Sequence, residues 1–363
     1  MSHYEERLQH DLDEIRARVE AIGTTVAEAI KKAVHAFLTG EQDLAAEVIL
    51  GDRRINRETR EIDHLCHTFV VRHLPSAGHL RFVSSVLRLS TELERVGDYA
   101  VTIGRETAQI SARPPSKVLH DLELIAGQAV EVLDQALLTF ADGNEERARG
   151  IMAMADQVRA TFQRSYIDLL SAGKKQKRPV HDLFALLVVL TSIGRVADQA
   201  KNICEQVIFA MTGEVKGERT YRILFLDERN DCLSQIAEAF ARKAFPNSGE
   251  YASAGWNPAQ KVSAQCQHFL DRNGYNSHGI TPRPLPVLLE ELAHFHIVIG
   301  LESGVREQLA EVPFRTVVLE WPIGPVAGDL DQERSQALLE TAFKAVADRM
   351  GDLMGTLRGD EAD

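Results

Sequence analysis

The chain of 363 residues carries 41 basic and 53 acidic side chains, a net charge of −12. Its length allows two or three domains, and its acidic balance disfavours bulk nucleic acid or an anionic membrane surface as the main partner. Its four cysteines form no C-x-x-C pair, which disfavours a zinc site or a disulfide framework and favours a reducing compartment. The polar amino terminus and the short apolar runs, the longest at 183–190, predict a soluble, cytoplasmic protein without a signal peptide or membrane span.

The first 213 residues predict six amphipathic helices. From Leu8 to Phe37 apolar residues recur every three or four positions, which is typical of one face of a helix, and Gly40 ends the pattern. Arg113-Pro114-Pro115 separates the third helix from the fourth, because proline cannot continue a helix. Similar patterns predict further helices over 43–73, 79–112, 116–141, about 144–172 and 180–213.

The third and sixth predicted helices carry an internal repeat. Segments 95–103 and 195–203 share the frame R-V-[GA]-D-x-A-x-x-I at a displacement of 100 residues. Gly40 and Gly143 also occupy matching positions in the helix order. Together these features predict two tandem three-helix repeats, over 1–113 and 114–213.

Beyond a linker at 214–220, the pattern changes to that of an α/β domain over 221–357. The continuous apolar run at 222–226 is typical of a buried parallel strand, and Ser234 is a suitable N-cap for the next helix. Strands separated by helices predict a parallel sheet. The expected fold class is therefore multidomain α and α/β, with tandem three-helix bundles before a three-layer, parallel-sheet domain. Further strands are predicted at 251–255, 296–300 and 316–319, a last helix at about 331–356, and a disordered tail at 358–363.

Oxygen-bearing side chains four residues apart form a candidate metal site in the helical half. Glu94 and Asp98 share one helix face, and Asp52 and Asn56 form a similar pair on the preceding helix. Two such pairs can hold a cation such as Mg²⁺, Mn²⁺ or iron. Spacing alone favours the simpler interpretation of a solvated acidic face that neighbouring arginines neutralise.

The segment 93–103, LERVGDYAVTI, resembles the L-E-R-I-G-D-H-A-x-N-I signature of the PhoU family of phosphate-uptake regulators. Segments 80–83 and 45–56 resemble the same family, and the resemblance covers about residues 1–213. It implies a repressor of phosphate-starvation signalling that acts between a phosphate ABC transporter and a sensor histidine kinase. It also implies metal on E-x-x-x-D faces, with no other cofactor expected, and we expect a homodimer.

The sequence departs from the PhoU pattern in both repeats. In the first repeat, Tyr99 and Thr102 stand where the family has histidine and asparagine. In the second repeat, Gly194 replaces the glutamate, while Asp198 and Asn202 remain. We therefore expect metal at the first repeat and weak or no binding at the second.

The segment 223–239 resembles the opening of the low-molecular-weight protein tyrosine phosphatases and the related arsenate reductases. Their loop reads C-x-G-N-x-C-R-S, followed by x-x-A-E-A, and a loop between a strand and a helix can hold phosphate on its backbone amides. Several motifs match in order, over about residues 221–357. The matching residues are Asn230, Cys232, Ser234, Ala237, Glu238, Ala239, Ser253, Ala254, Gly255, Gly274, His278 and Arg283.

The chemical residues of that family are missing from this chain. Phosphatase chemistry of this kind needs a thiolate, an arginine clamp and a proton donor. By the resemblance, these three positions hold Asp227, Leu233 and Gly324. Arg229 replaces a loop glycine, and we interpret Cys232 as a structural thiol.

We therefore expect a phosphate-signalling regulator that acts through protein–protein contacts, with an inactive phosphatase-like domain as a binding or scaffolding module. One alternative is a phosphatase or arsenate reductase with relocated catalytic residues. A second alternative is a metal-binding helical bundle with an arsenic- or metal-responsive role. The degenerate phosphate loop consists of Asp227, Asn230, Cys232, Leu233 and Ser234.

Overall fold

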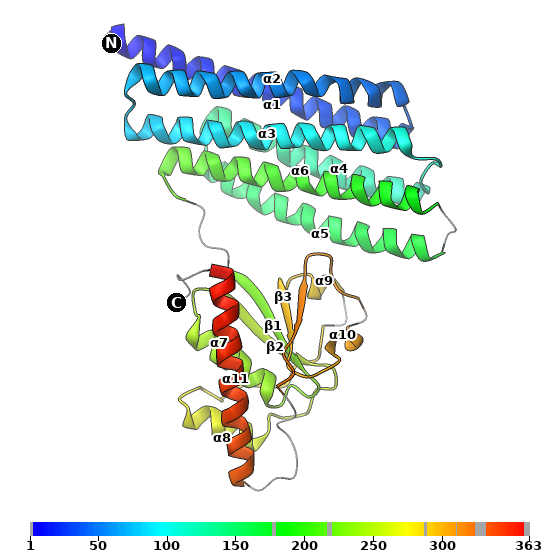
Figure 1. Cartoon of the computed structure of the whole chain (residues 1–363), viewed down its shortest axis with the longest axis vertical. Helices are drawn as coiled ribbons and strands as arrows, with labels where there is room; N and C mark the ends of the chain where they lie inside the picture. The colour runs from blue at the N-terminus through cyan, green and yellow to red at the C-terminus, as the bar shows by residue number, and fades with distance from the viewer. Residues whose placement is uncertain are drawn as a thin grey trace. The chain divides into compact units, whose positions relative to one another are not determined.

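The computed structural model forms two compact units that divide between Lys216 and Gly217 (Figure 1). This boundary falls within the segment predicted as a linker, of which residues 216–219 lie outside the described residues. The structure describes residues 3–175, 179–215, 220–286, 289–309, 311–323 and 332–358.

The described residues of the N-terminal unit form six long helices that run in alternating directions (Figure 1). Left-handed glycines end three of them, namely Gly40 (φ 82°), Gly143 (φ 59°) and Gly213 (φ 80°), because glycine adopts this conformation without a Cβ clash. The predicted apolar stripes face one shared core. The helices are α1 (His3–Thr39), α2 (Gln42–His73), α3 (Ala77–Gln109), α4 (Ser116–Asp142), α5 (Glu145–Lys175) and α6 (Val180–Thr212).

The two helical repeats meet where α3 packs against α6 (Figure 1). The Gln199 side-chain amide donates to the Tyr99 hydroxyl at 3.3 Å, and these two residues occupy equivalent positions 100 residues apart. A single hydrophobic cluster includes buried residues of all six helices. The repeats therefore form one packed body rather than two bundles with separate cores.

Two helices of this unit, α4 and α6, are long and apolar enough by length and composition to cross a membrane. The length of the longest uninterrupted apolar run does not indicate these two helices, because scattered polar residues interrupt both. The bundle buries 44% and 50% of their most apolar windows. Their hydropathy is therefore explained by core packing, and it is weak evidence for a membrane span.

The C-terminal unit is built on a parallel four-stranded sheet of order β2-β1-β3-β4. The central strand β1 is buried on both faces, which explains its uninterrupted apolar run. Ile223 and Phe225 pack on one face, in a cluster with side chains of α7 and α11, whereas Leu224 and Leu226 pack on the other. The strands are β1 (Tyr221–Asp227), β2 (Gly249–Gly255), β3 (Ile297–Gly300) and β4 (Val317–Glu320).

The helices α7, α8 and α11 contact one another, and the short helices α9 and α10 contribute to the opposite face of the sheet. This arrangement is the predicted three-layer α/β architecture. The helices are α7 (Leu233–Ala244), α8 (Ala264–Arg272), α9 (Leu289–Leu292), α10 (Val305–Gln308) and α11 (Gln332–Arg358).

Two details of the sequence prediction were wrong. The N-cap of α7 is Cys232 rather than Ser234, because the amide of Ser234 already lies in the first turn and donates to Asp227. Helix α11 continues to Arg358, the first residue of the predicted tail. Residues 359–363 lie outside the described residues.

Candidate functional site

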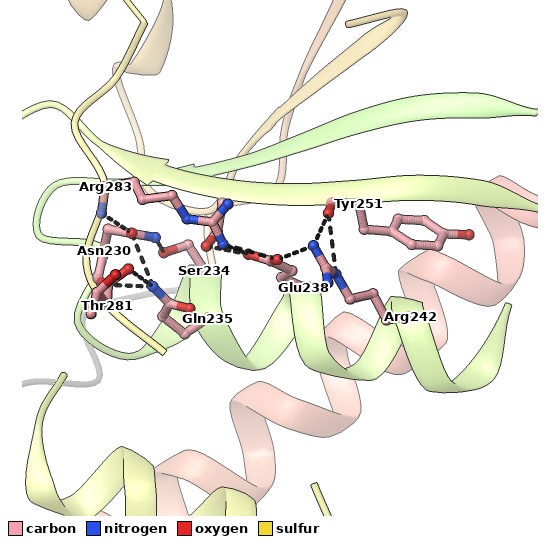
Figure 2. Close-up of polar contacts among 9 residues, drawn as sticks. Asn230, Ser234, Gln235, Glu238, Arg242, Tyr251, Thr281 and Arg283 are labelled. Atoms are coloured by element: carbon pink, nitrogen blue, oxygen red, sulfur yellow. Dashed lines mark hydrogen bonds and ion pairs between the residues drawn. The ribbon is translucent and has the colours of Figure 1, made fainter. Parts of the chain in front are cut away.

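The phosphate-loop-like segment joins the carboxyl end of β1 to the start of α7. Within it, Asn230 is fully buried and left-handed (φ 48°), a conformation that asparagine tolerates better than most residues. Its side-chain amide donates to the Ser234 hydroxyl at 2.8 Å, and its side-chain oxygen accepts from the Arg283 amide at 2.7 Å (Figure 2). Gln235 donates to the same oxygen at 3.0 Å. Hydrogen bonds between uncharged groups therefore help to hold the loop in this conformation.

The Asp227 carboxylate lies inside this loop and is only 3% exposed. One of its oxygens accepts from the amide of Ser234 at 2.8 Å, and the other accepts from the amide of Asn230. Backbone amides of such loops are the donors that bind an oxyanion. The side chain of Asp227 therefore occupies two of these donors as an internal anion.

The surroundings of Asp227 are electrostatically unsuited to phosphate. Burial raises the pKa of Asp227, the amide hydrogen bonds from Ser234 and Asn230 oppose this shift, and the charge of Asp231 adds to it. Burial and the charge of Asp227 also raise the pKa of Glu302, which accepts from the amide of Glu228 at 3.1 Å. Carboxylates therefore surround the place where an oxyanion would need positively charged side chains.

Leu233 and Arg229 stand at the positions of the phosphatase arginine and loop glycine. In the described structure, neither supplies a clamp for the oxygens of a phosphate. Leu233 is 4% exposed and packs in the apolar cluster with Ile223 and Phe225. Arg229 is exposed, and its guanidinium pairs with Asp231 at 2.8 Å. Gly324, the position of the general acid, lies outside the described residues.

An ionic network around the buried carboxylate of Glu238 supports the loop from α7 and β2 (Figure 2). Glu238 accepts from the Ser253 hydroxyl at 2.7 Å and pairs with Arg242 at 2.7 Å and Arg283 at 3.1 Å. Arg242 also donates to the carbonyl oxygen of Tyr251 at 2.8 Å. Glu238, Ser253 and Arg283 all match the phosphatase pattern, so part of that pattern builds the support of the loop.

Sequence reasoning did not identify Gln235 or Arg242 as members of this network. Arg242 follows Glu238 by four residues, a spacing that signals a pair on one helix face. Gln235 offered no such signal, because its amide bonds to Asn230 and to the carbonyl oxygen of Thr281, 46 residues away.

Cys232 is buried, as expected of a structural thiol, and its carbonyl oxygen accepts from the thiol of Cys266 at 3.6 Å. All four cysteines are free and buried. Burial raises the pKa of the Cys66 and Cys204 thiols to about 12, which disfavours reactive thiolates at those two positions.

In the first helical repeat, the structure brings part of the candidate metal site together. Asn56 donates to one oxygen of Asp52 at 2.7 Å, and the other oxygen of Asp52 is buried without a hydrogen-bond partner. Partial desolvation and the charge of Asp52 raise the pKa of Asp98 across the helix interface. Within the described ranges, Glu94, Asp98 and Asp52 do not form a group with all ligand atoms within 4.8 Å.

In the second repeat, neighbouring side chains occupy the equivalent space. A Cβ atom added to Gly194 would lie 2.9 Å from the ring of Phe162, so an aromatic side chain fills the position of the lost glutamate. Asp198 pairs with Arg159 at 3.3 Å. Asn202 donates to Glu92 at 3.2 Å, which directs this amide to a carboxylate of the first repeat.

Comparison with known proteins assigns both units to families. The PhoU domain family matches residues 19–107 and 120–207, and the low molecular weight phosphotyrosine protein phosphatase family matches residues 222–319. The phosphate-specific transport system accessory protein PhoU of Edwardsiella tarda is 27% identical over 204 residues, which cover 56% of this chain and 84% of that protein. Its counterpart in Escherichia coli K12 is 26% identical over 212 residues, with 58% and 88% coverage.

Among solved structures, the crystal structure of PhoU from Pseudomonas aeruginosa aligns with a TM-score of 0.54 at 26% identity. The alignment covers 57% of this chain and 99% of that one. The N-terminal unit therefore has the fold of a complete PhoU protein, and a phosphatase-like α/β domain follows it.

We expect the stability of the C-terminal unit to depend on pH through Asp227. The pKa of this carboxyl is raised above its ordinary value of 3.8, so the folded chain retains a proton that the unfolded chain has released. Stability is therefore lost as pH rises from 3.8 through the raised pKa, by about 1.4 kcal/mol per pH unit within this interval. Asp227→Asn cannot titrate, so its stability relative to wild type should rise over this interval.

Urea unfolding followed by tryptophan fluorescence tests this prediction, because Trp256 and Trp321 both belong to the C-terminal unit. Asp352→Asn, at an exposed position of α11, is the matched control and should follow wild type. A stability difference between wild type and Asp227→Asn that stays constant between pH 4 and pH 7.5 would contradict the prediction.

Proposed function

We propose that this chain, which joins two PhoU domains to a low-molecular-weight phosphatase-like domain, is a cytoplasmic regulator of phosphate transport and phosphate signalling that acts through protein–protein contacts. The observation that carries the proposal is the PhoU match over both helical repeats. Relatives aligned over 84% and 88% of their own length are named accessory proteins of the phosphate-specific transport system. The proposed partners are a phosphate ABC transporter or a sensor histidine kinase, and the proposed assembly is a homodimer.

We further propose that the phosphatase-like domain is catalytically inactive and serves as a binding or scaffolding module. The loop amides that would hold a phosphoryl group already bind the Asp227 carboxylate. Leu233 packs in the apolar core in place of the arginine. The supporting network around Asn230 and Glu238 nevertheless keeps the loop ordered, which favours a role that needs the domain's shape rather than its chemistry.

Deletion of the gene tests the regulatory role. We expect the deletion strain to express phosphate-starvation genes in phosphate-rich medium, because a repressing contact with the transporter or kinase is lost. Transcript levels and phosphate uptake measure this effect, and the full chain supplied in trans should reverse it. Asp227→Asn should also reverse it, since the proposal assigns no chemistry to this residue. A deletion strain with normal responses to phosphate would eliminate the regulatory role.

An enzymatic alternative requires Asp227 or Cys232 to act as a nucleophile, and both side chains are buried. We expect purified protein to show no turnover of p-nitrophenyl phosphate, and none of arsenate with thioredoxin or glutathione. Product release above the protein-free rate, abolished by Asp227→Ala or Cys232→Ser, would instead establish a phosphatase or reductase with relocated chemistry. Activity that survives both substitutions would indicate a contaminating enzyme.

We also propose a divalent or iron-type cation at the first helical repeat, with Asp52, Asn56, Asp98 and Glu94 as ligands. The unpartnered buried oxygen of Asp52 and the raised pKa of Asp98 fit an oxygen-ligand site that a cation would stabilise. Elemental analysis of the untagged protein should find less metal after Glu94→Ala/Asp98→Ala. Asp198→Ala in the second repeat is the matched control and should retain the wild-type content. Equal metal content in all three proteins would remove the site.

A further inference from the structure

A second group of metal-ligating side chains lies near the amino end of α1. His10, Asp11 and Glu14 each offer a ligand atom, and all three atoms lie within 4.8 Å of one another. Across the described parts of the chain, this is the one group of three histidine, cysteine or acidic residues that meets this criterion. It lies next to His73 at the end of α2, about 25 Å along that helix from Asn56. The group is therefore separate from the acidic pairs of the first repeat.

Two ligand atoms of the group lie at a separation that a metal ion would need. Glu14 follows His10 by one helical turn and Asp11 by three residues, so the three side chains share one face of α1. The imidazole Nδ1 of His10 lies 3.6 Å from Oδ1 of Asp11. This separation exceeds a normal hydrogen bond. It is near the roughly 3.4 Å that separates two ligand atoms on a tetrahedral zinc ion with bonds of about 2.1 Å.

Residues of α2 contact one oxygen of the Asp11 carboxylate. Its Oδ2 atom lies 2.7 Å from Nε2 of His73 and accepts from Arg72 at 2.8 Å. His73 is 2% exposed, its ring packs 5.0 Å from that of Phe69, and its carbonyl oxygen accepts from the Tyr4 hydroxyl. This packing fixes the carboxylate and leaves Oδ1 on the side of His10. Fixed partners behind a ligand are typical of metal sites.

The charges around the group permit a cation. The carboxylate of Asp11 supplies one negative charge and pairs with Arg72 at 2.8 Å. Glu14 supplies a second negative charge, which offsets the guanidinium of Arg72. The carboxylate of the nearby Asp13 accepts hydrogen bonds from Gln9 and Arg16.

We propose that His10, Asp11 and Glu14 bind a borderline divalent transition metal such as Zn²⁺. One imidazole nitrogen and two carboxylate oxygens are ligands of the type that zinc accepts. Three protein ligands leave a fourth coordination position, and His10 is exposed, so that position is open to water or to a side chain from another molecule. Through Asp11 and His73, the bound ion would also strengthen the contact between α1 and α2.

Cobalt substitution tests the proposal on the full-length, untagged protein after treatment with a chelator. We expect Co²⁺ to produce visible absorption bands that Zn²⁺ abolishes by displacement, without the near-ultraviolet charge-transfer band of a thiolate ligand. Calorimetric titration with Zn²⁺ should show a loss of more than about tenfold in affinity for His10→Ala and for Glu14→Gln. His10 is exposed and Glu14 is half-buried at the helix surface, so far-ultraviolet circular dichroism should remain unchanged.

Two matched variants separate this site from other metal-binding groups. His35→Ala removes an exposed imidazole near the other end of α1, which pairs with Glu41, and should leave the cobalt spectrum intact. Glu94→Ala/Asp98→Ala should also retain it, so failure of this site is distinguishable from failure of the first-repeat site. An unchanged spectrum and zinc affinity in His10→Ala/Glu14→Gln would overturn the proposal, as would a thiolate charge-transfer band.

Discussion

The conformation of the loop between β1 and α7 depends on the hydrogen bonds from the amides of Asn230 and Ser234 to the Asp227 carboxylate. A loop that curls around an oxyanion presents backbone donors that are costly to bury without an acceptor. In this chain the Asp227 carboxylate is that acceptor, so these two amides have hydrogen-bond partners without a ligand. The same carboxylate brings a negative charge to the place where a phosphoryl group would sit.

The structure keeps the loop and the contacts that support it, while the family's nucleophile and arginine positions hold Asp227 and Leu233. Asn230, Ser234 and Glu238 hold the turn, the first helical turn and the contact with β2. By the family resemblance, the nucleophile, arginine and proton-donor positions are others, and they hold Asp227, Leu233 and Gly324. Leu233 packs in the core, and Gly324 lies outside the described residues. The proposed role as a binding or scaffolding module requires only that the domain stay folded.

The two helical repeats also differ from each other at their equivalent candidate metal-binding positions. In the first repeat, Asp52 keeps a buried oxygen without a partner, and Asp98 lies close enough for their charges to interact. In the second, Phe162 packs against Gly194 and Arg159 neutralises Asp198. The space and the charge that a cation would need are thus both filled. Equivalent positions in a duplicated fold have therefore acquired unequal surroundings, which the shared sequence frame does not reveal.

Local sequence patterns by themselves predicted the long helices, the strands and their order along the chain, because apolar residues every three or four positions indicate one buried helix face and a continuous apolar run indicates a strand buried on both faces. Resemblance to the phosphatase motif placed Asp227, Leu233 and Gly324 at the nucleophile, arginine and proton-donor positions, and the identity of each side chain is read directly from the sequence. Only the tertiary structure decided what these and other side chains contact. The burial of Asp227 on backbone amides, the aromatic ring beside Gly194 and the pairing of Asp11 with His73, 62 residues away, depend on packing between distant segments. Such contacts leave no local periodicity, and so no sequence pattern predicted them.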